Sequence, residues 1–131
     1  FDVGSNHDVN KYNDNLIAFL FASLDGISKI GTFSGTGSEI NVDCGFTAGA
    51  RFVMIKRIDA GRADTHWYVF DTMHGIISGN DNYFALNDKN AYSTSYNYID
   101  PLNAGFTVTS AASANSGLNE DGATYLFLAI A

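Results

Sequence analysis

The chain has few charged residues and almost no cysteine or proline. Of its 131 residues, 16% are charged, one is cysteine and one is proline. A single cysteine, Cys44, excludes an internal disulfide and a zinc site built from several cysteines. Val42 and Cys44 fall on the same face of an alternating segment, so we expect Cys44 to be a small buried residue rather than a catalytic thiolate.

Positive charge is also scarce, since 7 Lys and Arg stand against 14 Asp and Glu, for a net charge of −7. No face can gather enough cations to neutralise a row of phosphates, so nucleic acid and anionic lipid are not expected partners. The apolar run Leu16–Phe21 is too short to span a bilayer, and we expect no membrane insertion. The chain begins at Phe1 with no charged segment before that run, so we expect a processed product or a fragment.

Aromatic residues, by contrast, are abundant at 14%, and there are 13 glycines. This composition disfavours disorder, and no segment shows sustained apolar spacing of three and four residues. Short strands separated by Gly, Asn and Asp turns predict an all-β fold, an antiparallel, jelly-roll-like β-sandwich. The expected strands are Asn15–Ala22, Ile27–Phe33, Glu39–Cys44, Ala50–Ile58, His66–Asp71, Tyr83–Leu86, Gly105–Thr109 and Ala123–Ala131. We expect Ser78–Pro101 to be an extended surface loop.

Alternation along these strands also predicts which residues form the core. The expected core residues are Phe52, Met54, Trp67, Val69, Phe106, Val108, Leu126 and Leu128.

The two ends of the chain share one order of features. Phe1–Ser23 and Phe106–Ala131 each open with Phe-x-Val, pass through Ser, Asn and Gly, and close on an apolar run, LIAFLFA or YLFLAIA. A sequence with two similar closing segments and only one middle segment is typical of a stretch taken from an array of repeats that starts partway through one repeat. We therefore expect Phe1–Ser23 to be the closing strands of an upstream unit and Leu24–Ala131 to be one complete unit. The alternative is two hairpins that are alike only in being rich in Asn and Gly.

Histidines and carboxylates show no catalytic or metal-binding pattern. His7, His66 and His74 lack metal-ligand spacing, and the aspartates lie mostly in turns, where Asp usually bonds its own backbone. Asn13–Asn15 and Asn80–Asn82 offer oxygen ligands without the spaced carboxylates of a calcium loop. We expect no catalytic residues, no metal site and no cofactor. A hydrolase with two carboxylates facing each other across a cleft stays open as an alternative.

Aromatic side chains of the central third are the candidate binding residues. Trp67 lies on a predicted strand, and Tyr92, Tyr96 and Tyr98 lie in the polar segment NAYSTSYNY, where we expect exposure. Exposed tyrosines among Ser and Asn suit contact with a sugar ring or a protein neighbour. Packing within the core or the loop is the alternative for each of them.

The apolar run near the N-terminus is the candidate assembly segment. Leu16, Phe19 and Phe21 expose too much apolar surface to stand alone, so they must pair with the same chain or with a neighbour. We expect this segment at or near a contact between subunits.

Several motifs also resemble a repeat unit of tail-fibre and related structural proteins of tailed bacteriophages, frequent in marine and cyanobacterial phages. The motifs are GFTAGARFVMIKRIDAGRADTHWYVFDTMHGI, NDNYFALNDKNA, IDPLNAGFTVTS and DGATYLFLAIA. The preceding LIAFLFASLDGISKIGTFSGTGS is similar to the junction between two such units. Fibre proteins are much longer than this chain, so the resemblance implies a missing upstream portion.

The resemblance implies a non-enzymatic structural module of a phage fibre or capsid appendage, located in the virion. Its expected partners are other virion proteins, copies of itself in a homo-oligomer, with a trimer favoured, and a host surface glycan or protein. The alternative is a secreted carbohydrate-binding or adhesive β-sandwich module.

Overall fold

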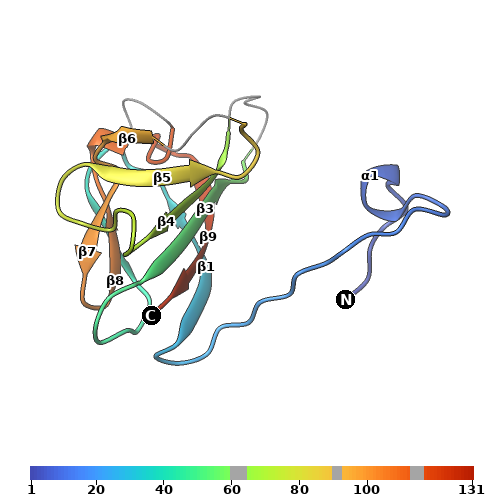
Figure 1. Ribbon diagram of the computed structural model, residues 1–131, viewed down its shortest axis with the longest axis horizontal. Helices are drawn as coiled ribbons and strands as arrows, with labels where there is room; N and C mark the ends of the chain where they lie inside the picture. The colour runs from blue at the N-terminus through green and yellow to red at the C-terminus, as the bar shows by residue number, and fades with distance from the viewer. Residues whose placement is uncertain (60–64, 90–92, 113–116) are drawn as a thin grey trace.

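Two antiparallel sheets packed face to face form the main body of the protein (Figure 1). The structure is a computed structural model that describes residues 1–59, 65–89, 93–112 and 117–131. The strands are β1 (Ser28–Ser34), β2 (Ile40–Asp43), β3 (Phe52–Arg57), β4 (Trp67–Asp71), β5 (Asp81–Ala85), β6 (Ser93–Tyr96), β7 (Ile99–Leu102), β8 (Gly105–Val108) and β9 (Thr124–Ile130). The expected all-β antiparallel sandwich is confirmed.

The larger sheet has the strand order β1-β9-β3-β4-β5-β6, and the smaller sheet has the order β2-β8-β7. Strand β9 lies between β1 and β3, with Leu128 opposite both Ile30 and Met54. Two strands that are distant in sequence therefore join through the last strand of the domain.

The strand expected at Tyr83–Leu86 is present as β5, but the expectation of a surface loop over the rest of Ser78–Pro101 is wrong, because this stretch also holds β6 and most of β7. Its Asn, Asp and Ser residues have low strand propensity, and tertiary contacts override that propensity. Asp81 is one such contact, since its Oδ2 accepts hydrogen bonds from the backbone N–H groups of Tyr98 (2.8 Å) and Ile99 (2.9 Å).

The core lies between the two sheets. The larger sheet contributes buried side chains of β3, β4 and β9, and the smaller sheet packs against them, with the rings of Phe106 and Phe127 5.5 Å apart. The buried residues at this interface include Val42, Val53, Ile55, Tyr68, Phe70, Ile99, Phe106, Val108, Tyr125, Phe127 and Ala129. Cys44 also belongs to this core, as expected.

The predicted core was right for the smaller sheet and only partly right for the larger one. Phe106 and Val108 are fully buried as expected. The other six residues lie on the opposite face of their strands and outside the core cluster: Phe52, Met54, Trp67, Val69, Leu126 and Leu128. Of these, Val69 and Leu128 are buried as expected, and the other four are half-buried. The alternating pattern does not show which face of these strands points into the core, because β3, β4 and β9 carry apolar residues on both faces. This pattern is typical of strands that are covered on both sides.

The carboxyl group of Asp81 is fully buried. Its Oδ1 has no hydrogen-bond partner among the described residues, and burial raises the pKa of the group to about 6. The folded protein therefore takes up a proton near pH 6, where the unfolded chain does not. The stability linked to this group is present at low pH and is lost as the pH rises through 6.

We expect the variant Asp81→Asn to lose this pH dependence. Asn keeps an acceptor oxygen for Tyr98 and Ile99 but does not titrate. From about pH 8 to about pH 5, the wild type should gain about 1.4 kcal/mol from this group relative to the variant. Urea unfolding of both proteins across this range measures the difference. Parallel pH profiles for the two proteins would show that Asp81 does not titrate there.

Residues 1–23, which we call the arm, contribute no strand and extend away from the sandwich (Figure 1). The arm carries the short helix α1 (His7–Asn10) far from the two sheets. The expectation of a buried strand at Asn15–Ala22 is therefore wrong, and Phe19 is 81% exposed. No helix in the described ranges is long and apolar enough to cross a membrane.

Hydrogen bonds anchor the base of the arm to β1. The Ser23 hydroxyl accepts a hydrogen bond from the Ile30 N–H (3.0 Å), and the Ser28 hydroxyl donates one to the Ala22 carbonyl (2.8 Å). Leu24 pairs with Ser28 across a turn that contains Gly26, whose φ of 69° suits glycine. The position at which the arm leaves the sandwich is therefore well defined.

Candidate functional site

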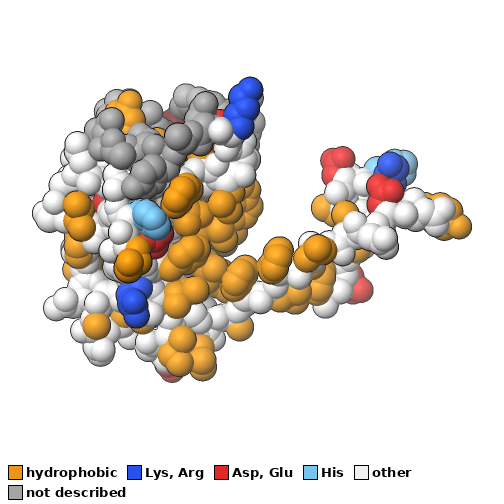
Figure 2. Space-filling model, viewed as in Figure 1, with side chains coloured by type: hydrophobic (Ala, Val, Ile, Leu, Met, Phe, Trp, Pro, Cys, Tyr) orange, Lys and Arg blue, Asp and Glu red, His pale blue; other side chains and the backbone are white. Residues whose placement is uncertain are grey.

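The outer face of the larger sheet, turned away from the smaller sheet, carries a continuous row of apolar side chains. Cross-strand register joins Ile30, Leu128, Met54, Val69 and Phe84 as successive neighbours on β1, β9, β3, β4 and β5. We call these five residues the apolar row. Hydrophobic side chains gather on the sandwich beside the arm (Figure 2). The row crosses five of the six strands of this sheet.

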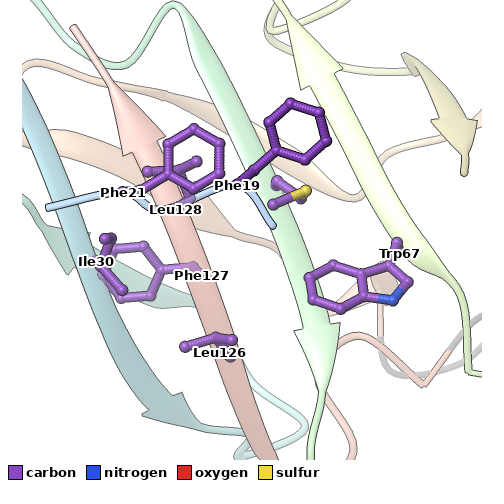
Figure 3. Close-up of a pocket in the computed structure, with 8 residues that line it drawn as sticks. Phe19, Phe21, Ile30, Trp67, Leu126, Phe127 and Leu128 are labelled. Carbon is purple, nitrogen blue, oxygen red and sulfur yellow. The ribbon is translucent and has the colours of Figure 1, made fainter. Parts of the chain in front are cut away.

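Near its base the arm passes over part of this row, where Phe19 and Phe21 line a hollow of about 230 Å³ together with Ile30, Met54 and Leu128. Figure 3 shows the rings of Phe19 and Phe21 over the strands that carry Met54 and Leu128. Trp67 completes one side of this hollow. An adjoining hollow of about 460 Å³ shares Phe19, Phe21, Met54 and Trp67 and continues to Leu86 and Asn87. We call the two together the arm hollow.

Trp67 is held in place by its neighbours. Its backbone N–H donates to Oδ1 of Asn87 (2.8 Å), and Nζ of Lys56 lies 6.0 Å from the centre of its ring. The same Nζ donates to the carbonyl oxygen of Thr65 (2.6 Å) and to its hydroxyl (2.9 Å). The half-buried indole therefore forms a fixed wall of the arm hollow.

The structure thus joins two groups of residues that the sequence assigned to separate roles. Trp67 was predicted to bind a ligand, and Phe19 and Phe21 were predicted to mediate assembly, yet all three line the same hollow. Leu16, the third predicted assembly residue, is exposed on the arm and does not line it. Met54 and Leu128, missed as site residues, were detectable as apolar positions on the second face of their strands.

The predicted tyrosines do not form a single exposed surface. Tyr92 lies outside the described residues. Tyr96 is 37% exposed and stacks on Tyr98, with ring centres 5.3 Å apart. The expected exposure of Tyr98 is wrong, because the residue is 1% exposed and packs against Tyr68 and Tyr83. Its backbone bond to Asp81 fixes it between the sheets.

The arm covers the apolar row only in part. Phe19 and Phe21 line the hollow but stay 81% and 55% exposed, and Leu16, Ile17 and Leu20 are also exposed. Fully burying one such side chain stabilises a protein by about 1.5–3 kcal/mol. A large part of that stabilisation is not realised by the single chain.

The titratable groups of the described residues do not gather at the arm hollow. Burial and the neighbouring Asp43 raise the pKa of the Cys44 thiol to about 11, so the thiol stays protonated at neutral pH. Arg57 contacts Asp59 and Glu120 at one end of the sandwich, and the hydrogen bond with Asp59 raises its pKa. Within the described ranges, no three His, Cys, Asp or Glu side chains are grouped as metal ligands. The chemistry of the hollow is apolar and aromatic.

The fold and the hollow define a two-sheet β-sandwich with an apolar arm on its outer face. A family model matches residues 1–131, so the chain belongs to the family described as a domain of unknown function, DUF7483. The match includes the arm as well as the sandwich. No curated protein and no solved structure matches the chain.

Proposed function

We propose that the chain is a non-enzymatic structural module of a phage virion, in a fibre or a capsid appendage. The observation that carries the proposal is the apolar row on the outer face, together with the apolar arm beside it. Contiguous apolar surface of this kind marks a site of protein contact. The resemblance to repeat units of tail-fibre proteins supports the virion as the setting for that contact.

The module acts by holding neighbouring proteins in position. Its partners are other virion proteins and further copies of the chain, in a homo-oligomer for which a trimer is favoured. Contact with a host surface glycan or protein belongs to the same role, and it uses exposed aromatic residues such as Tyr96. The buried, protonated thiol of Cys44 suits such a passive role.

The test is whether the chain is part of an intact particle. Virions from a lysate that contains this sequence are purified on a density gradient and analysed by mass spectrometry. We expect the chain to accompany the particles at a constant ratio to the capsid protein through successive gradients. Recovery of the chain only in the particle-free fractions would contradict the proposal.

A carbohydrate-binding or adhesive module is the second candidate, and one observation favours it. Trp67 lies beside Asn87 at the wider end of the arm hollow, and an aromatic ring next to an amide suits a sugar ring. A glycan array probed with wild type and with Trp67→Ala tests this role. Binding that is lost in the variant would favour the adhesive module over a purely structural one.

A further inference from the structure

We infer that the arm of one copy lies on the outer face of a second copy, so that exchanged arms link the chains of an oligomer. The inference rests on the proposed structural function and names its partner, a second copy of this chain. The occupant of the apolar row in the assembly is the segment Leu16–Phe21 of the neighbour.

The first argument is that the arm and the row fit each other. Phe19 and Phe21 already line one hollow with Met54, Trp67 and Leu128 within one chain. The family match covers residues 1–131, so each copy carries both the arm and the surface that accepts it. A contact of this kind can be made between chains by the same residues, as in domain swapping.

The second argument is that the arm is held only at its base. Ala22 and Ser23 hydrogen-bond to Ser28 and Ile30, whereas residues 15–21 make no hydrogen bond to the described part of the sandwich. The arm can therefore move to a neighbouring copy without breaking any hydrogen bond between the strands of its own sandwich.

The third argument is length. An extended chain advances about 3.3 Å per residue, so residues 12–21 span roughly 30 Å. Strands lie about 4.8 Å apart, so a six-stranded sheet is roughly 25 Å wide. The arm can therefore cross the whole outer face of a neighbouring sandwich. In the single chain, α1 instead lies far from both sheets (Figure 1). The exposed side chains of the arm are therefore not covered by a sheet of their own chain.

Paired cysteine variants test the exchange directly. One chain carries Phe21→Cys on the arm and the other carries Met54→Cys on the outer face, both with Cys44→Ala so that no native thiol takes part. The two chains, distinguished by a tag, are unfolded, mixed in equal amounts, refolded and oxidised. Arm exchange should give a disulfide between unlike chains in up to about half of the molecules, the statistical share of mixed pairs.

Two controls separate arm exchange from random cross-linking and from a contact within one chain. Met73 is 84% exposed and lines neither part of the arm hollow, so Met73→Cys mixed with Met54→Cys measures random cross-linking. A single chain with both Phe21→Cys and Met54→Cys reports the arrangement within one chain. Unlike-chain disulfides no more frequent than in the Met73 control, with an intrachain disulfide in the double variant, would overturn the inference.

Removal of the aromatic rings is a second, independent test. We expect Phe19→Ser with Phe21→Ser to convert the oligomer to monomers while the unfolding transition of the sandwich stays within a few degrees. Met73→Ser is the matched control and should leave the oligomer intact. Size-exclusion chromatography with light scattering gives the mass. An unchanged mass for the double variant, or a monomeric wild type, would contradict the exchange.

These results separate the inference from the proposed function. If the wild type is an oligomer but the arm-to-face disulfides do not form, the inferred arm exchange is contradicted and the proposed structural role is not. If the chain is absent from purified particles, the proposed virion role is contradicted, whether or not the arms exchange.

Discussion

Replacing Phe106 by Ala should destabilise the sandwich by about 3–5 kcal/mol, the usual cost of truncating a large buried aromatic residue. Phe106 is fully buried on β8, and its ring meets that of Phe127 edge to face at 5.5 Å. It therefore connects the smaller sheet to β9 of the larger one. Urea unfolding of the wild type and of Phe106→Ala measures the loss.

Phe1→Ala is the matched control, because it removes the same atoms from an exposed position on the arm. We expect its free energy of unfolding to equal that of the wild type within about 0.5 kcal/mol. Similar losses for the two variants would show that Phe106 does not join the two sheets.

Replacing Gly105 by Ala should cost more than about 3 kcal/mol, the upper end of the usual range for overpacking. Gly105 lies opposite Asp43 in the pairing of β8 with β2. A Cβ atom there would lie 2.1 Å from the carbonyl oxygen of Val42 and 3.0 Å from the backbone nitrogen of Cys44. Because the obstacle is backbone, the β2–β8 pairing must shift.

The Gly105 carbonyl also accepts a hydrogen bond from the Ala50 N–H (2.9 Å), so the segment before β3 helps to hold this position of the strand. Gly4→Ala is the control, since a Cβ on that arm residue meets nothing within 4 Å. Thermal unfolding followed by circular dichroism should show a much lower midpoint for Gly105→Ala. Equal midpoints for the two variants would mean that the β2–β8 pairing differs from the one described.

The strand pattern of this protein was largely readable from the sequence, because its β-branched and aromatic runs are separated by Gly, Asn and Asp turns. The strands β6 and β7 were missed for a definite reason. Their Thr, Tyr and Ile residues favour strands but stand among Ser, Asn, Asp and Pro, which do not, and Asp81, distant in sequence, fixes the backbone of Tyr98 and Ile99. Contacts of that kind leave no local signal in the sequence.

The candidate site was predicted in part. Phe19, Phe21 and Trp67 stood out as aromatic residues in unusual places, and all three line the arm hollow. The inner and outer faces of β3 and β9 were exchanged in the prediction, since Met54 and Leu128 are as apolar as Val53 and Phe127. Only the position of the second sheet decides which set becomes the core, and a single alternating strand does not contain that information.

The position of β9 between β1 and β3 has a consequence for the order of folding. Strands β1 and β3 have no pairing with each other, and each meets β9 along nearly its whole length. During synthesis, the edges of β1 and β3 that pair with β9 therefore stay unpaired until Thr124–Ile130 has left the ribosome. Such late, long-range closure is slow and leaves strand edges open to other nascent chains. This sandwich should therefore depend on chaperones during synthesis more than a fold in which strands adjacent in sequence pair with each other.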